Sequence, residues 1–184
     1  MANGKLYVIS GASGVGKSTV LKQVLSARKD ICFSVSATTR APREGEIEGV
    51  SYYFVTHEKF RQMIENDEFV EYDDHMSNFY GTPRAQLEEK LSRGHVILDI
   101  EPVGAFNVRA QRPDAVLIFI APPSAEELER RLRGRGDTPE EQIAVRLARA
   151  QWEMDQSEKY DYIVINDRVE SCVEALLNII NNNE

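Results

Sequence analysis

The sequence predicts an α/β fold in which helices cover a central parallel sheet, and its apolar runs carry that prediction. Four short runs of almost continuous apolar, β-prone residues lie at 6–10, 96–100, 116–120 and 162–165. Helical patterns lie between several of them, and strands that are apolar on both faces are typical of parallel sheets buried between helices. The 184 residues, of which 42% are hydrophobic and 28% charged, suffice for one well-buried core.

A glycine-rich segment follows the first apolar run. Residues 11–19, GASGVGKST, match the pattern G-x-x-x-x-G-K-[ST]. Glycines permit the positive-φ turns and close backbone approach that a bound polyphosphate requires, Lys17 supplies a cation, and the Ser18 hydroxyl can bind Mg²⁺. The segment predicts a P-loop nucleoside-triphosphate fold with a Mg-nucleotide bound by Gly11, Ala12, Ser13, Gly14, Val15, Gly16, Lys17, Ser18 and Thr19.

An accidental strand-to-helix turn is the alternative interpretation of this segment. Apolar residues at helical spacing follow it, at Val20, Leu21, Val24 and Leu25, and this context favours nucleotide binding. A dinucleotide-binding fingerprint is disfavoured, because Thr19 stands where a third small residue, glycine or alanine, is needed.

Residues 33–82 interrupt the alternation of apolar runs and helical patterns. Short aromatic-rich runs predict strands at 33–36, 52–55, 69–72 and 78–80, with a helix at 57–66. They predict a small inserted α+β domain. The expected division is a core of 1–32, 83–123 and 155–184, an insert of 33–82 and a lid of 124–154.

A helix is expected directly after the insert. Thr82 can cap it, Pro83 suits its first position, Leu87 and Leu91 fall on one face, and Gly94 ends it. The chain is further expected to close with a helix over 169–180.

Two arginine-rich helices are expected in the lid. Ser124 and Glu127 form a capping box for the first, and glycines at 134 and 136 break it. The second begins near Thr138 and carries an apolar stripe of Ile143, Leu147, Ala150 and Met154. The lid arginines are Arg130, Arg131, Arg133, Arg135, Arg146 and Arg149. A solvated charged face, balanced by nearby glutamates, is favoured for most of them, whereas the glycines beside Arg135 favour a functional role there.

A second phosphate site is indicated by Arg40 and Arg43. Two arginines three residues apart, with nearby hydroxyls of Ser36, Thr38, Thr39 and Tyr52, can bind a phosphate by bidentate hydrogen bonds. The alternative is a basic surface loop paired with Glu44 and Glu46.

The composition of the chain limits the classes of partner that we expect it to bind. A net charge of −8 and a pI near 5.0 argue against a duplex nucleic-acid partner. The sequence has no long apolar run and its first residues lack the features of a signal peptide, so we expect a cytoplasmic protein with no membrane partner. Cys32 and Cys172 are expected to be small buried hydrophobes.

The sequence resembles the guanylate kinases from about residue 5 to its C-terminal helix. The stretches that carry the resemblance, in order, are GASGVGKST, SATTRAPREGE with Tyr52, EFVEY, NFYGTP, VILDIE, APPS, RLRGRG and IVIND. The resemblance implies a P-loop core with an inserted nucleotide-monophosphate domain and a lid. It also implies transfer of the γ-phosphoryl group of MgATP to GMP, giving ADP and GDP, and leaves dGMP open as a second acceptor.

The resemblance also assigns roles to residues. It implies GMP-phosphate binding by Arg40, Arg43, Tyr52 and Tyr80, and guanine recognition by Glu71 with Ser36 and Thr82. Asp99 is similar to the carboxylate that orients Mg²⁺ through water, and Glu101 is expected to face the acceptor base or ribose, both side chains lying on one face at the end of their strand. Lys17, Arg135 and Arg146 resemble the catalytic cations, and Asn166 resembles the adenine contact.

One segment departs from the family pattern. Members usually carry glutamine before the glycine that follows the acidic pair, whereas this chain has Pro102 and Val103 before Gly104, so an altered loop is expected there. Two rival functions are a peptide-binding scaffold domain, which the intact P-loop argues against, and a kinase for another acceptor, which Glu71 and the TTRAPR stretch argue against.

Overall fold

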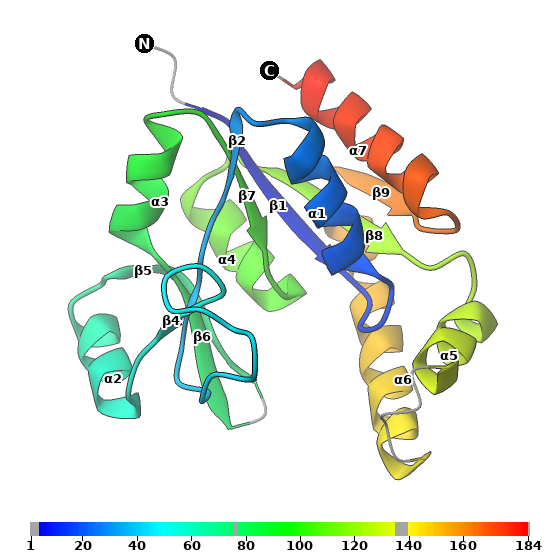
Figure 1. Ribbon diagram of the computed structural model, residues 1–184, viewed down its shortest axis with the longest axis horizontal. Helices are drawn as coiled ribbons and strands as arrows, with labels where there is room; N and C mark the ends of the chain where they lie inside the picture. The colour runs from blue at the N-terminus through cyan, green and yellow to red at the C-terminus, as the bar shows by residue number, and fades with distance from the viewer. Residues whose placement is uncertain (1–3, 76, 135–139, 184) are drawn as a thin grey trace. The chain divides into compact units, whose positions relative to one another are not determined.

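The computed structural model describes residues 4–75, 77–134 and 140–183 (Figure 1). The chain divides into two compact units, each built from two separate stretches of sequence. The first unit comprises Met1–Leu6 and Asp30–Ala115, and the second comprises Tyr7–Lys29 and Val116–Glu184.

The second unit contains three parallel strands, β1 (Leu6–Gly11), β8 (Val116–Ala121) and β9 (Tyr162–Ile165). β1 pairs with β8 from Tyr7 opposite Val116, and β8 pairs with β9 from Ile118 opposite Tyr162. Every residue of β1 is buried, and all of β8 except its last residue is buried. These two strands show the apolar character on both faces that predicts a parallel sheet between helices.

Helices α1 (Lys17–Ala27) and α7 (Val169–Asn182) pack against each other in this unit (Figure 1). The expected closing helix is confirmed, and Cys172, Leu176 and Ile180 are its buried residues. The hydroxyl of Tyr7 donates to the carbonyl of Ile180 at 3.1 Å, so the first strand and the last helix share one core.

The same unit carries α5 (Ala125–Gly134), α6 (Glu140–Asp155) and a short 3-10 turn, η1 (Ser157–Lys159). The expected cap of α5 is present, since the backbone N–H of Glu127 donates to the Ser124 hydroxyl at 3.2 Å. Ile143 and Ala150 of the expected stripe on α6 are buried. The predicted break after Gly134 and the second start signal near Thr138 lie outside the described residues.

The first unit contains the parallel pair β2 (Ile31–Phe33) and β7 (His95–Asp99). It also contains a four-stranded sheet in the order β4-β3-β6-β5, made of β4 (Tyr53–Phe54), β3 (Ala37–Thr38), β6 (Asn78–Pro83) and β5 (Phe69–His75). Helices α2 (His57–Glu65), α3 (Arg84–Leu91) and α4 (Pro102–Gln111) complete this unit.

The small sheet and α2 enclose a hydrophobic cluster of their own. Its buried members are Ala37, Phe60, Met63 and Phe69. The ring of Phe60 stacks on that of Phe69, with 4.4 Å between their centroids, and on that of Phe79 at 5.4 Å. The aromatic residues of the predicted insert therefore form a local core.

Several expected elements differ from the structure. The run at 33–36 is not one strand: β2 ends at Phe33, and β3 begins at Ala37. β2, which pairs with β7 in the parallel sheet, was missed, because a run of three residues is too short to show a pattern. The helix α4 was also missed.

The predicted start of the helix after the insert is wrong. Thr82 and Pro83 are the last residues of β6, and α3 begins at Arg84 without a side-chain cap. The physical reason is that Thr82 and Pro83 are paired with β5, and the Thr82 hydroxyl is directed across the sheet, where it donates to the carboxylate of Glu71 at 2.5 Å. Leu87 and Leu91 are buried on one face of α3, as predicted.

Among the described residues, no helix is both long enough and apolar enough to cross a membrane.

Candidate functional site

The glycine-rich segment is the turn between β1 and α1 in the second unit. β1 ends at Gly11 and α1 begins at Lys17, so residues 12–16 form the loop. Gly14 and Gly16 have φ values of 89° and 95°, which side chains rarely adopt. A Cβ on Gly14 would lie 2.5 Å from Cδ2 of Leu132, and one on Gly11 would lie 2.6 Å from the carbonyl oxygen of Ile120. Glycine is therefore required at positions 14 and 16 by backbone conformation, and at positions 11 and 14 by close packing.

The N-terminus of α1 suits an anion. Its cap residue, Gly16, has no side-chain oxygen to accept the first backbone N–H groups of the helix. The positive end of the dipole of this 11-residue helix therefore favours a negatively charged group, such as a phosphate, at the loop. Lys17 is half-buried and Ser18 is exposed, both in the first turn of the helix.

A cavity of about 290 Å³ lies beside this loop. A cavity of roughly 150 Å³ accommodates a benzene ring, so this one has room for a bicyclic base. It is lined by Gly14, Val15, Gly16, Thr19, Arg131, Asn166, Asp167 and Val169.

Asn166 lies in the wall of the cavity and is buried, with 2% of its surface exposed. Its side-chain Nδ2 donates to the carbonyl of Val15 at 2.7 Å, and its backbone N–H donates to Ala121 at 2.8 Å. Its Oδ1 is buried and has no hydrogen-bond partner among the described residues. The side chain thus supports the loop with one end and offers an acceptor with the other.

Arg131 has a structural role that the sequence analysis missed. Its guanidinium donates to the carbonyls of Asn166 at 2.8 Å and Val15 at 3.3 Å, and to the carboxylate of Glu127 at 2.7 Å. Arg131 therefore joins α5 to the loop. The sequence signal was the RLRGRG stretch, but a charged helix face was favoured instead.

The other described arginines of the expected lid differ from Arg131. Arg130 pairs with Glu127 and Arg133 with Glu129 on the exposed surface of α5, which confirms the predicted charged face. Arg146 is half-buried on α6. Arg135 lies outside the described residues.

Arg40, Tyr52 and Tyr80 lie together in the first unit. The Arg40 guanidinium lies over the Tyr52 ring at 5.4 Å, and the rings of Tyr52 and Tyr80 meet edge to face at 5.9 Å. Burial raises the pKa of the Tyr52 hydroxyl, and the nearby charges of Tyr80 and Asp99 raise it further. The structure thus brings four predicted residues, including Asp99 at the end of β7, into one region.

Glu46 accepts hydrogen bonds from both arginines of this loop. Its carboxylate accepts from the Arg40 guanidinium at 2.8 Å and from the backbone N–H of Arg43 at 2.7 Å. The hydrogen bond from Arg40, followed by that from Arg43, lowers the pKa of Glu46, so it is ionised at neutral pH. The alternative of a loop paired with an acidic neighbour is thus correct for Glu46, and the same donors can bind a phosphate once the carboxylate moves. The Arg43 side chain and Ser36 are exposed and half-buried, respectively.

Glu71 is a buried carboxylate on β5, with 6% of its surface exposed. A register shift between Phe69 and Glu71 places Glu71 opposite Thr82, whose hydroxyl donates to it at 2.5 Å. Bulges of this kind reorient side chains next to binding sites. Burial raises the pKa of Glu71 to about 7, the Thr82 hydroxyl opposes this, and the charge of Asp73 adds to it.

The segment at 102–103, where the sequence departs from the family pattern, is the start of a helix. Pro102 is the first residue of α4, a position that proline favours, and Glu101 is its cap residue. The expectation that Asp99 and Glu101 share one strand face is therefore wrong, since β7 ends at Asp99 and Glu101 is not part of it. Gly104 lies against Glu71, because a Cβ on it would be 2.6 Å from Glu71 Oε2.

Gly104→Ala tests this close contact. The added methyl group must displace the Glu71 carboxylate, so we expect recognition of the acceptor to fall by roughly 10- to 100-fold, the effect of losing a hydrogen bond to a charged group. Acceptor KM and the thermal melt are the measurements. A variant that melts as the wild type does and has an unchanged acceptor KM would separate Glu71 from the site.

Three features define a P-loop nucleotide-binding protein. They are the glycine turn at the carboxyl end of β1, the helix that begins at Lys17, and the base-sized cavity beside both. Residues 3–183 match the family model for guanylate kinase, and the chain belongs to that family.

Similar proteins agree with this family. A guanylate kinase of Trichodesmium erythraeum is 47% identical over 181 residues, spanning 98% of this chain and 97% of that protein. One from Thermus thermophilus is 48% identical over 178 residues, spanning 96% of this chain and 80% of that protein. The crystal structure of guanylate kinase from Anaplasma phagocytophilum has a TM-score of 0.80 at 35% identity, covering 99% of this chain and 87% of that one.

Proposed function

We propose that this chain transfers the γ-phosphoryl group of ATP to GMP, giving ADP and GDP. Family membership over nearly the whole chain carries the proposal. The intact phosphate loop in one unit and the buried Glu71 in the other support it, because the first suits a nucleoside triphosphate and the second suits guanine. We also propose a cytoplasmic location, where both nucleotides are available.

The donor nucleotide is assigned to the loop and its cavity. Backbone N–H groups of residues 11–19 and the Lys17 ammonium would bind the phosphates, and the base would enter the cavity lined by Asn166. Adenine carries an exocyclic amine, and the buried Oδ1 of Asn166 is an acceptor of matching chemistry. Arg135 and Arg146, from the proposed lid of 124–154, are assigned to the transferring phosphoryl group.

The acceptor is assigned to the insert. Arg40, Arg43, Tyr52 and Tyr80 would bind the GMP phosphate, which would replace Glu46 at the Arg40 guanidinium. Glu71 would accept the ring N–H and the amine of guanine, with Ser36, Thr82 and Glu101 around the nucleoside. Adenine lacks this pair of adjacent donors and would leave the buried carboxylate unpaired, so it is rejected.

Magnesium fits the donor set of this chain. No group of three His, Cys, Asp or Glu side chains suited to a metal occurs among the described residues. Mg²⁺ usually needs few protein ligands, since it keeps several waters and binds substrate phosphates, and Ser18 offers a direct oxygen ligand with Asp99 acting through water. When bound, it neutralises charge on the phosphates. The acceptor phosphate is already nucleophilic, so the protein supplies position and positive charge, and no covalent intermediate is needed.

The test of the activity is ADP formation from MgATP with GMP, dGMP, AMP, UMP, CMP or no acceptor, measured in parallel. We expect fast turnover with GMP and little with AMP, UMP or CMP. Equal ADP formation in every reaction would overturn the acceptor assignment, and no ADP in any of them would overturn the activity and favour a binding domain.

The pKa of Glu71 predicts how GMP binding depends on pH. Guanine needs the ionised carboxylate, but the empty site holds the proton up to about pH 7 because burial disfavours the charge. Below that pH, binding must release a proton, so GMP affinity should fall about tenfold for each unit by which the pH is lowered. At pH values more than about one unit above the pKa of Glu71, the affinity should no longer change with its protonation. The same shift stabilises the empty folded protein below its unfolded pKa near 4.5, and this contribution is lost as the pH rises through about 7.

Calorimetric titration of GMP between pH 5 and 9 measures this dependence. GMP has a phosphate pKa near 6 of its own, so Glu71→Gln is the matched control. The affinity ratio of wild type to variant should rise with pH up to about 7 and then stay constant. A ratio that does not change with pH would show that Glu71 is not deprotonated on binding.

A further inference from the structure

Glu153 is a buried carboxylate on α6 that has been assigned no role so far. Its exposed fraction is 1%. Oε2 accepts the backbone N–H of Ser13, in the phosphate loop, at 2.8 Å, and Oε1 accepts Nε of Arg149, one turn earlier on α6, at 3.1 Å. The two oxygens therefore join the loop to the helix.

Stability alone does not explain this arrangement. Removing a carboxylate from water is costly, and a buried ion pair often stabilises a fold no better than apolar residues of similar size. Arg149 is itself partly exposed, at 37% of its side chain, and lies over the ring of Trp152. The specific feature of Glu153 is its hydrogen bond to the phosphate loop.

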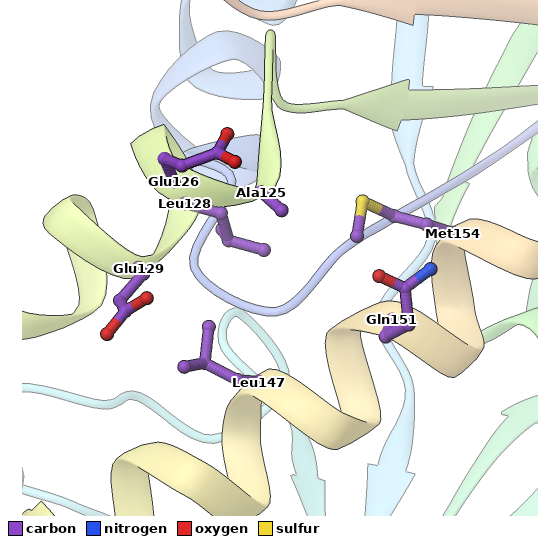
Figure 2. Close-up of a pocket in the computed structure, with 7 residues that line it drawn as sticks. All are labelled: Ala125, Glu126, Leu128, Glu129, Leu147, Gln151 and Met154. Carbon is purple, nitrogen blue, oxygen red and sulfur yellow. The ribbon is translucent and has the colours of Figure 1, made fainter.

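The apolar packing between α5 and α6 is incomplete near Glu153. A cavity of about 210 Å³ lies between α5 and α6, and Figure 2 shows Leu128 and Leu147 directed into it from the two helices. Met154, the neighbour of Glu153, lines the same cavity. Because apolar contact between the two helices is incomplete there, α5 constrains this part of α6 weakly, and the Ser13 hydrogen bond supplies a directional constraint.

Arg146 lies seven residues before Glu153 on the same helix. Seven residues are close to two full turns, so both side chains leave the same face of α6. A bond that fixes Glu153 against the loop therefore also fixes the rotation of the face that carries Arg146.

We propose that Glu153 is a positioning residue that sets the phosphate loop, through the Ser13 N–H, in a fixed relation to the Arg146 face of α6. This inference rests on the proposed ATP site. It predicts that substitution of Glu153 lowers the affinity for the donor nucleotide and leaves the affinity for GMP unchanged.

Three substitutions separate the bond from the charge. Glu153→Ala removes the acceptor, Glu153→Asp keeps the charge but is one methylene too short, and Glu153→Gln keeps an oxygen that can accept from Ser13. We expect ATP affinity and kcat/KM for ATP to fall roughly 10- to 100-fold in the Ala and Asp variants, the effect of losing a hydrogen bond to a charged acceptor. The Gln variant should retain most of the wild-type value, and GMP affinity should be unchanged in all three.

Glu129→Ala is the matched control, because it also removes an i,i+4 pair with an arginine, Arg133, and has no place in the proposed site. ATP and GMP affinities are measured by direct titration, so the result stands even if the protein fails to phosphorylate GMP. Equal losses for ATP and GMP, an unchanged ATP affinity in the Asp variant, or a Gln variant as weak as Asp would overturn the proposal. If the Ala variant does not fold, the Asp and Gln pair decides.

Discussion

Replacing Lys17 with alanine should reduce kcat by about 10³-fold or more. Lys17 is the first residue of α1, beside the loop that the phosphates occupy in the proposed site. Negative charge on the transferring group must be stabilised by groups already in place, and removing such a group typically costs about 10²–10⁵-fold in rate. Steady-state kinetics with saturating MgATP and GMP measure the loss.

The fold should survive this change. Lys17 is half-buried, so the variant should melt within about 3 °C of the wild type. Lys22→Ala, which removes an exposed lysine from the same helix, serves as the control and should keep full activity. Turnover near the wild-type level in the Lys17 variant would remove this lysine from the mechanism.

Replacing Glu71 with glutamine should reduce kcat/KM for GMP by about 10²–10³-fold. The amide presents an NH₂ donor toward the two donors of guanine, in a site where only 6% of the residue is exposed. Disrupting a buried, hydrogen-bonded charged group costs roughly 3–4 kcal/mol, which corresponds to that ratio. The KM for ATP should change by less than about threefold, because no donor-site residue is altered.

Asp74→Asn is the matched control for Glu71. It removes one negative charge from the same strand, β5, but its side chain is exposed. The control should bind GMP as the wild type does. Equal losses for ATP and GMP in the Glu71 variant would mean that another residue recognises guanine.

The sequence predicted the elements whose patterns are long. The apolar runs of β1 and β8 and two residues of the predicted stripe on α6, Ile143 and Ala150, were located correctly, because burial imposes a repeating requirement on many residues. β2 was not found as a core strand, since its three residues carry too little pattern.

Thr82 shows why a local signal can mislead. A threonine before a proline is a good helix start, but the buried Glu71 lies opposite it on the neighbouring strand and requires a donor. The pairing of β6 with β5 outweighs the local preference, and the helix begins at Arg84, one residue after the predicted first position. Only the pairing of β5 with β6 reveals it.

The missed site residues are those whose function depends on long-range contacts. Arg131 was interpreted as part of a charged helix face and Glu153 was not singled out, yet they contact the phosphate loop over 116 and 140 positions of sequence, respectively. Glu153 lies three residues after the buried Ala150, and an acidic residue on the buried side of a helix was the available signal. Residues grouped by a motif, such as Arg40 and Tyr52, were found because the motif keeps them close together.

The most direct test follows the γ-phosphoryl group itself. The protein is incubated with ATP labelled at the γ-phosphate and an excess of GMP, and the labelled products are separated. The proposed activity predicts that the label appears in GDP and that labelled GDP is absent without GMP. Label released as inorganic phosphate at the same rate with and without GMP would contradict the proposal, because the protein would then hydrolyse ATP without using the acceptor.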